Sequence, residues 1–244
     1  MTAARSSAAV KSPNASSAVR QQRHEAHDSL DDFPTPPWAT RALLARVFGD
    51  GLLPLIAREP AANRGHMVRP LAERFGYVEA SDIHDYGAGF EQRDYLFGPE
   101  PDPVDWTITN PPFRLAEQFI ARALATSRVG VAIIVRSAFT EGAGRYALIF
   151  SKTPPSQILY FAERVVMHRG HLPNPNVSIE SIDPKTGLMV KKKPSTPTAY
   201  CWMVWYQKWN ECFCETDWIA PCRARFEVDG DYPADGIARI GGAS

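Results

Sequence analysis

The sequence has no excess charge of either sign and no long apolar run. Its 27 Lys and Arg residues balance 27 Asp and Glu residues, so the chain has no general basic surface for a nucleic acid. A polyanionic partner would have to be held by a local patch. No apolar stretch is long enough to cross a membrane, and the run at residues 201–206 (CWMVWY) indicates one buried strand. We therefore expect a soluble, cytoplasmic protein.

Cysteine is scarce, and its spacing is not that of a structural zinc site. The four thiols are Cys201, Cys212, Cys214 and Cys222. They lack the paired C-x-x-C arrangement of zinc knuckles, and no His lies close to them in sequence. The sequence thus predicts no metal site, and it predicts reduced thiols of the kind found in cytosolic proteins.

Both ends of the chain lack hydrophobic periodicity. Residues 1–30 are rich in Ala and Ser and contain no acid before Glu25, which predicts a disordered basic arm. An organellar transit peptide has a similar composition, but the arm has no convincing apolar face, so we do not expect organellar targeting. The Gly-rich residues 229–244 are expected to form a flexible tail. One domain over residues 31–228 remains.

Within this domain, strand-like and helix-like stretches alternate, which predicts an α/β fold with a doubly wound sheet. The chain is long enough to bury one full core, and no internal repeat is visible. The expected strands are Leu55–Arg58, Tyr77–Ser81, Trp106–Thr109, Val129–Val135, Gln157–Phe161 and Tyr200–Tyr206. The expected helices are Trp38–Val47, Met67–Phe75 and Leu115–Leu124.

The most informative motif is TNPPF at residues 109–113, directly after a β-branched, apolar run. Because Pro111 and Pro112 cannot continue a sheet ladder, the strand should end with Asn110 displayed at its carboxyl end. Open α/β sheets bind their ligands at that end. The side-chain carbonyl of Asn110 and the backbone carbonyl of Pro111 are suited to accept the two hydrogens of an aromatic amine, which turns its lone pair toward a methyl donor.

Phe113 would then stack on a base that has been flipped out of a duplex. The alternative is an ordinary strand-to-helix turn, with Phe113 in the hydrophobic core. The motif alone does not separate these two interpretations.

Four further motifs precede Asn110 in a fixed order. They are DDFPTPPW at residues 31–38, REPAANRGHM at 58–67, ASDI at 80–83 and RDYL at 93–96. With the catalytic motif, this order resembles the S-adenosylmethionine-dependent DNA adenine-N6 methyltransferases, especially the compact phage and prophage type. The resemblance spans about residues 31–209. It implies a Rossmann-like methyltransferase sheet, mostly parallel with an antiparallel edge strand, in a bacterial or phage-infected cell.

The resemblance also implies that S-adenosyl-L-methionine is the cofactor and assigns its binding residues. Glu59 would lie near the ammonium and sulfonium charge, and Asp82 would accept from two ribose hydroxyls. Asp94 would accept from the adenine amine, with Tyr95 or Leu96 covering the ring. The full expected set is Thr35, Glu59, Ala61, Asn63, Gly65, Asp82, Asp94, Tyr95 and Asn110.

Two of these assignments depend on backbone geometry. Thr35 precedes the first helix, where a hydroxyl and free N–H groups suit the donor's carboxylate. Asn63 stands where the family has its first motif glycine. Because Asn adopts the left-handed conformation more readily than other non-glycine residues, the tight turn between Ala61 and Gly65 can survive the change.

Residues after the TNPPF motif are expected to contact the substrate. The segment at residues 158–167 (ILYFAERVVM) resembles one in which an Arg is followed, three positions later, by an aromatic that packs on the flipped base. Here the two positions are Arg164 and Met167. Residues 168–197 are Pro-rich and lack apolar periodicity, and we expect this insertion to read the target sequence. Residues 164–193 contain six Lys or Arg against two acids, a local charge of +4.

Within this basic segment, the residue types suggest a division of roles. Lys191, Lys192 and Lys193 suit phosphates, whereas Arg164, Arg169 and His171 suit base edges. A solvated basic loop with no binding role is the alternative.

Three function classes remain open. The first is methyl transfer to adenine N6 in DNA. The second is the same chemistry on RNA or on another planar amine or amide, because the motif reports the amine and not the polymer. The third is a nucleic-acid-binding protein on an inactive methyltransferase fold, which Asn63 in the glycine turn would favour. The recognition sequence and the oligomeric state are not encoded in any visible pattern.

Overall fold

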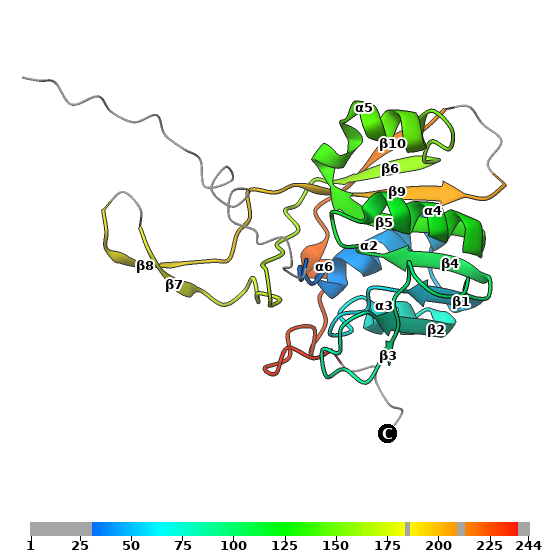
Figure 1. Ribbon diagram of the computed structural model, residues 1–244. Coiled ribbons are helices and arrows are strands. Elements are labelled where there is room, and N and C mark those ends of the chain that lie inside the picture. Colours follow the sequence, from blue (N-terminus) through cyan, green and yellow to red (C-terminus); the bar gives the residue numbers. More distant parts are fainter. Residues whose placement is uncertain (1–30, 184–185, 209–212, 239–244) are drawn as a thin grey trace, which may run out of the picture. The chain divides into compact units, whose positions relative to one another are not determined.

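The computed structural model describes residues 31–183, 186–208 and 213–238. The predicted arm at residues 1–30 and the last six residues lie outside the described residues. Within this part of the chain, the main sheet has the order β10-β6-β9-β5-β4-β1-β2-β3 (Figure 1). Its strands are β1 (Leu53–Glu59), β2 (Phe75–Asp82), β3 (Glu91–Gln92), β4 (Val104–Thr109), β5 (Ser127–Arg136), β6 (Gln157–Phe161), β9 (Tyr200–Tyr206) and β10 (Glu215–Ile219).

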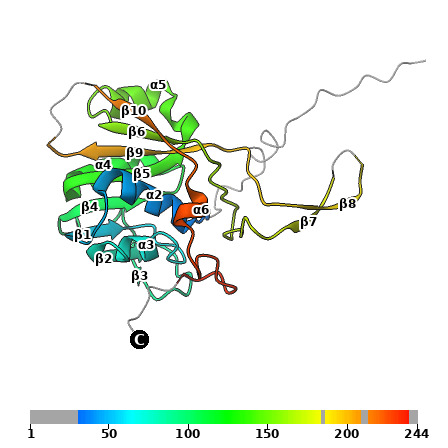
Figure 2. The same ribbon diagram turned by 180° about the vertical axis from the view of Figure 1, so that it is seen from behind.

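Helices cover both faces of this sheet (Figures 1 and 2). They are α2 (Pro37–Phe48), α3 (Val68–Ala72), α4 (Ala116–Thr126), η1 (Ser137–Thr140), α5 (Ala143–Arg145), η2 (Tyr146–Phe150) and α6 (Arg223–Phe226). The alternating side chains of β5 show why two layers are needed. Val131 and Ile133 pack in the cluster that contains α4, whereas Ala132 and Ile134 pack in the cluster that contains α2. A strand that is apolar on both faces is stable only when both are covered.

The prediction of a mostly parallel α/β sheet is confirmed, with one change in strand position. β9 runs antiparallel to both of its neighbours, β5 and β6, so it lies inside the sheet and not at the predicted edge. The strand is apolar on both of its faces, and its residues 201–204 have no exposed surface. An edge position would leave part of these side chains in water, so β9 is more stable between two other strands. β10 forms the edge instead and leaves Trp218 64% exposed.

The six expected strands are all present, and the helices expected at α2 and α4 are confirmed. The helix expected at Met67–Phe75 is shorter, since α3 ends at Ala72 and Phe75 already begins β2. Phe75 is drawn into the sheet because its ring is buried against Phe48, at a centroid distance of 5.4 Å. β10 was not expected.

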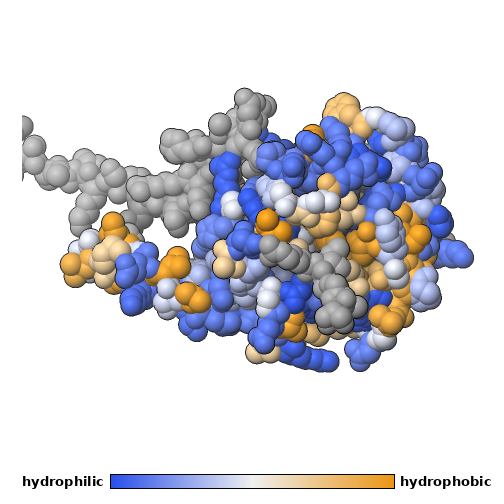
Figure 3. All heavy atoms as spheres, turned by 90° about the horizontal axis from the view of Figure 1, so that it is seen from below, coloured by the Kyte–Doolittle hydropathy of each residue, from blue (hydrophilic) through white to orange (hydrophobic). Residues whose placement is uncertain are grey.

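Residues 168–197 contain regular structure that the sequence pattern did not predict. A two-stranded hairpin of β7 (Ile179–Ile182) and β8 (Met189–Lys192) projects from the sheet domain (Figures 1 and 2). Its apolar side chains are largely exposed, with Ile182 at 66% and Met189 at 61%. Figure 3 shows these apolar groups interspersed with hydrophilic ones on the projecting hairpin. The hairpin was missed because it has no buried face to impose an apolar period.

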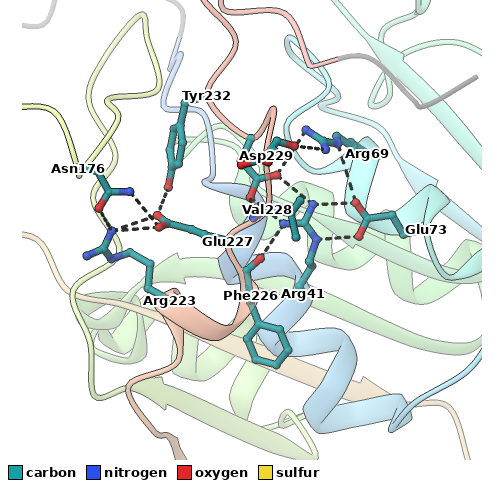
Figure 4. A network of polar contacts seen from close by, with 11 residues as sticks. Arg41, Arg69, Glu73, Asn176, Arg223, Phe226, Glu227, Val228, Asp229 and Tyr232 are labelled. Carbon is teal, nitrogen blue, oxygen red and sulfur yellow. Dashed lines mark hydrogen bonds and ion pairs between the residues drawn. The ribbon is translucent and has the colours of Figure 1, made fainter.

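The prediction of a flexible tail from residue 229 is wrong for residues 229–238. Asp231 has no exposed surface, and both of its carboxylate oxygens accept from Arg41 on α2, at 2.8 and 3.0 Å (Figure 4). Arg41 also donates twice to Glu73, at 2.7 Å each. Gly-rich composition suggested disorder, but one buried ion pair fixes this segment to the domain.

Within the described residues, Cys201, Cys214 and Cys222 are free thiols, whereas Cys212 lies outside them. In the same part of the chain, no helix has the length and apolar character of a membrane span, and no group of His, Cys, Asp and Glu residues is arranged to hold a metal ion.

Candidate active site

Asn110 lies directly after the last residue of β4, at the carboxyl end of the sheet. Its side-chain Nδ2 donates to the backbone oxygen of Phe33 at 2.9 Å and to Thr35 Oγ1 at 3.0 Å. Both amide hydrogens are therefore used. Among the described residues, none donates to Asn110 Oδ1, so this oxygen keeps its acceptor capacity for a ligand.

Pro111 and Pro112 end the strand, as predicted. Pro111 is buried, and no described residue donates to its backbone oxygen. The oxygen of Pro112 accepts from Leu115 N at 2.9 Å, which closes the turn into α4. Two consecutive residues thus offer acceptor oxygens that the fold itself does not use, namely Asn110 Oδ1 and Pro111 O.

Phe113 is half-buried and has two ring neighbours. The guanidinium carbon of Arg136 lies over its ring, 4.0 Å from the centroid. The ring of Phe33 lies at a centroid distance of 5.3 Å, tilted by 41°. The ring thus packs in part on the core, as the alternative interpretation holds. The face that a base would use is covered by Arg136, a residue that the sequence did not single out.

Thr35 and Met167 support Asn110 in this structure. Thr35 is buried, and its hydroxyl accepts from Asn110. Met167 is only 3% exposed, and its sulfur lies 3.9 Å from Asn110 Nδ2. In this structure Met167 therefore lies in the core beside Asn110, and its side chain is not displayed toward the position expected for a base.

Glu59 ends β1 and has no exposed surface. Its Oε1 accepts from Thr109 Oγ1 at 2.5 Å and from Ala61 N at 2.9 Å. Its Oε2 is buried and has no partner among the described residues. Burial raises the pKa of Glu59 to about 8, and the bonds from Thr109 and Ala61 oppose this rise only in part.

The turn after β1 has the left-handed geometry that the sequence predicts. Asn63 has a φ of 50°, and Gly65 has a φ of 86°. The space beside the Gly65 Cα is occupied by other parts of the chain, however. A Cβ there would lie 2.6 Å from the backbone oxygen of Ala238 and 3.1 Å from the Phe90 ring. Gly65 is thus required for the close approach of the carboxyl-terminal segment as well as for the turn.

Asp82 ends β2 beside this turn. Its Oδ2 accepts from Asn63 N and its Oδ1 from His84 N, each at 2.9 Å. Burial raises the pKa of Asp82, and these backbone bonds oppose the rise. Each oxygen retains a lone pair for a further donor. The structure therefore brings Glu59, Asn63 and Asp82 together at adjacent strand ends.

In the RDYL motif, Asp94 and Tyr95 both make contacts within the protein itself. Asp94 Oδ1 accepts from Leu96 N at 2.9 Å and from Phe97 N at 3.2 Å, and this bonding fixes the loop after β3. Tyr95 is 4% exposed and packs on Phe119 of α4, at a centroid distance of 5.0 Å. Its ring belongs to the core in this structure, and Leu96 is the other residue that the motif offers to cover a cofactor ring.

An ion pair that the sequence did not indicate joins the DDFPTPP segment to the glycine turn. Asp32 accepts from Arg64 at 3.0 Å and from Asn63 Nδ2 at 2.8 Å. The guanidinium of Arg64 also lies 4.7 Å from the Tyr86 ring centroid. The signal that could have found this pair is an acid next to the N-terminal motif and a base inside the turn motif.

The insertion begins close to these residues. Gly170 N donates to the backbone oxygen of Asp32 at 2.8 Å, so the turn that carries Arg169 and His171 lies beside the DDFPTPP segment. Both side chains are exposed. The structure also brings Arg164 and Lys193 together, because both line a cavity of 180 Å³ next to the start of α2.

Lys191 and Lys192 are not brought together. Successive residues of a strand point to opposite faces, so these neighbours in β8 cannot contact the same side of the hairpin. Lys191 stands opposite Glu180 in the register, and Lys192 stands opposite Ile179. The expectation that three successive lysines contact phosphates as one group must therefore be revised.

No protein-family model and no curated protein sequence matches this chain. Among solved structures, it is similar to a candidate class I S-adenosylmethionine-dependent methyltransferase from Listeria monocytogenes. The TM-score is 0.51 at 12% identity, over 81% of this chain and 69% of that protein. At this identity the likeness shows the fold alone, which is a Rossmann-like α/β sheet.

Two other structures are similar at TM-scores below 0.5. One is a modification subunit of a candidate type I restriction enzyme from Vibrio vulnificus, with a TM-score of 0.48, 16% identity and coverage of 78% of this chain and 47% of that one. The other is a candidate RNA methyltransferase from Pyrococcus horikoshii, with a TM-score of 0.45, 15% identity and coverage of 80% and 96%.

Proposed function

We propose that this protein transfers the methyl group of S-adenosylmethionine to N6 of adenine in DNA. The observation that carries the proposal is the pair of unused acceptors, Asn110 Oδ1 and Pro111 O, at the carboxyl end of β4. An aromatic amine has two hydrogens and a delocalised lone pair. Two acceptors in this arrangement hold the hydrogens and free the lone pair for attack.

The residues at the neighbouring strand ends fit the proposed donor. Glu59 Oε2 is a buried acceptor without a partner among the described residues, and a positive charge beside it would favour its ionised form. Asp82 retains lone pairs for ribose hydroxyls, and Asp94 for an adenine amine. When bound, S-adenosylmethionine supplies an electrophilic methyl group on a sulfonium sulfur.

In the proposed reaction, the fold contributes orientation. Asn110 is held by two bonds to the DDFPTPP segment, so its acceptor is preorganised and need not be ordered when the substrate binds. N6 forms a bond to the methyl carbon as the bond from carbon to sulfur breaks. N6 then releases one proton to solvent and becomes a secondary amine, and the demethylated donor leaves as a neutral thioether.

DNA is favoured as the substrate by the exposed basic elements around the catalytic motif. Arg169 and His171 lie on a turn that contacts Asp32, and the β7–β8 hairpin projects beyond it. A two-stranded ribbon of this kind can lie along a duplex with a lysine against its phosphates. We propose that the turn reads base edges and that the hairpin contacts the phosphate backbone.

The test is transfer of labelled methyl from S-adenosylmethionine to DNA, followed by identification of N6-methyladenine. Asn110→Ala should reduce the rate by at least about 100-fold while leaving donor binding nearly unchanged, because the lost acceptor acts mainly in the transition state. Gln207→Ala is a matched control. This amide also donates to backbone oxygens, those of Leu124 and Ser127, but it lies near the opposite end of β5.

The substrate alternatives are outcomes of the same assay. Methyl transfer to RNA but not to DNA would show that RNA is the substrate, and the proposed chemistry at the amine would stand. Donor binding without transfer to DNA, RNA or glutamine peptides would support an inactive fold. Near-normal turnover by Asn110→Ala would reject the site itself.

A further inference from the structure

Arg136 is a cation at the end of β5 whose position the proposed reaction does not explain. β5 pairs with β4 in parallel, and Thr109 stands opposite Ile133, so Arg136 follows at the carboxyl edge beside the catalytic motif. Its guanidinium carbon lies 4.0 Å from the Phe113 centroid and 5.9 Å from that of Phe33. The charge is therefore held against an aromatic pair.

This guanidinium lacks the anionic partner that a half-buried arginine normally has. No carboxylate in the described part of the chain forms an ion pair with Arg136, and its Nε is buried without a hydrogen-bond partner. Arg58, which is also buried, donates twice to Glu79. A cation–π contact attracts the charge but satisfies no N–H donor. Its guanidinium bonds to the side chain of Tyr200, which stands opposite Arg136 on β9, so Arg136 has a neutral partner but no anionic one in the described part of the chain.

The observed position of Arg136 also conflicts with methyl transfer. A base that stacks on Phe113 needs the ring face that the guanidinium covers. In addition, N6 gains positive charge as the methyl carbon is transferred, and a nearby guanidinium would oppose that charge. Arg136 must therefore leave the ring face when the substrate binds, and its charge then favours a position beside an anion of the substrate.

We propose that Arg136 binds a phosphate that flanks the target adenine and thereby uncovers Phe113 for the base. A guanidinium forms two parallel bonds with a phosphate, and every nucleotide in a polymer carries this anion next to its base. The inference rests on the proposed function and narrows its substrate class. Arg136 selects a phosphodiester-linked adenine over a free base or a side-chain amide of a protein.

The experiment removes the phosphate charge and the arginine separately and together. An oligodeoxynucleotide that the wild type methylates is prepared with a neutral methylphosphonate at one flanking position or the other. At one position, the wild type should lose roughly 10- to 100-fold in kcat/KM, the size of a charged hydrogen-bond pair. Arg136→Met should lose a similar factor on unmodified DNA and nothing further on the neutral analogue.

Two variants and a binding assay keep the test decisive. Arg128→Met, at the exposed amino end of the same strand, should behave as the wild type with both oligonucleotides. Arg136→Lys keeps the charge without the planar fork and should retain part of the effect. Unfolding midpoints and donor binding show whether the variants are folded. Anisotropy with the same labelled oligonucleotides measures the coupling without turnover.

Each outcome decides the matter. If the losses from Arg136→Met and from the methylphosphonate multiply, or if neither neutral position affects the wild type, the inference is overturned while methyl transfer stands. If no transfer occurs but the binding losses are coupled, the proposed function fails and the phosphate site stands. If the wild type does not bind the oligonucleotide, both are rejected.

Discussion

Glu59 links the chemistry of a single residue to the proposed cofactor site. A carboxyl group with no exposed surface and one oxygen without a partner among the described residues is held mainly protonated at neutral pH, since burial raises its pKa to about 8. Relative to an unfolded pKa of 4.5, the folded state binds the proton more tightly. The contribution of Glu59 to stability is therefore fully present below about pH 4.5 and is lost as the pH rises through 8.

A cationic ligand should reverse this preference, which gives a testable pH dependence. We expect S-adenosylmethionine to bind more tightly as the pH rises from 6 to about 8, because binding then requires less proton release. Calorimetry in two buffers of different ionisation enthalpy would count the protons released. Glu59→Gln removes this titration but keeps that of the ligand's own amine, so it is the matched control. If the affinity for S-adenosylmethionine depended on pH equally in the wild type and in Glu59→Gln, the positive charge of the ligand would not lie beside Glu59.

At the scale of elements, the sheet places the site by bringing strands β1, β2 and β4 side by side. The order depends on close packing where β4, β5 and β9 meet. Gly130 of β5 lies under Trp106, and a Cβ there would be 2.4 Å from the Trp106 ring and 2.7 Å from the backbone oxygen of Trp205. The indole and the backbone are both fixed by burial, so neither can move away easily.

Gly130→Ala should lower the free energy of unfolding by about 1–3 kcal/mol, the usual cost of overpacking a core. Chemical denaturation would measure it. Gly144→Ala is the control, because a Cβ at that helical position meets nothing within 4 Å. It should leave stability unchanged or raise it by up to about 1 kcal/mol. Equal stability of the Gly130→Ala and wild-type proteins would contradict the packing described for β5.

The β7–β8 hairpin gives a second prediction at this scale. Its two strand lysines face opposite sides, and Lys191 stands opposite Glu180. One DNA backbone can therefore contact only one of them, and we expect Lys192. The double variant Lys191→Ala/Lys192→Ala should reduce the slope of log affinity against log salt by about 0.9, the value for one contact. Lys152→Ala, at an exposed site after η2, serves as the control.

A drop of about 1.8 in the double variant would mean that both lysines reach phosphates, and the hairpin would then have to lie edge-on to the DNA. No change at all would place the phosphate contacts on Arg164 and Lys193, which line the cavity beside α2.

At the scale of the whole molecule, the carboxyl-terminal segment holds distant parts of the domain together. Asp231 forms ion pairs with Arg41 of α2 and Arg69 of α3, two residues that Figure 4 shows beside this segment. Ala238 N donates to the backbone oxygen of Arg64 in the glycine turn at 2.8 Å. Residues 229–238 thus cover the candidate cofactor turn from the end of the described chain. Loss of this segment should therefore weaken both the fold and donor binding.

Asp231→Ala should destabilise the protein by about 3–5 kcal/mol, because it leaves the buried Arg41 with one carboxylate fewer. Thermal unfolding measures the change, and limited proteolysis should cut residues 229–238 first in this variant. Glu117→Ala breaks a partly exposed pair with Arg145 and should cost less than about 1 kcal/mol. An unchanged midpoint in Asp231→Ala would show that the segment is dispensable.

The sequence by itself determined the α/β class of the sheet and the order of six strands along the chain. Apolar runs of strand length, the proline pair after β4 and the turn at Asn63 are local signals, since each depends on the conformational limits of neighbouring residues. They were sufficient to predict six strands, two helices at nearly full length and the position of Asn110 at a strand end.

Only the tertiary structure decided which side chains contact the residues of the candidate site. Several contacts join segments that are distant in sequence. They are Arg136 over Phe113, Arg64 with Asp32, Met167 beside Asn110, and the bond that Arg41 donates to Asp231. Such pairs leave no periodic trace, because they depend on which strand ends meet and not on local conformation. For the same reason, the burial of Tyr95 and the ordered contacts of residues 229–238 were not foreseen. Burial is a property of the assembled core, and a short polar or Gly-rich segment does not encode it.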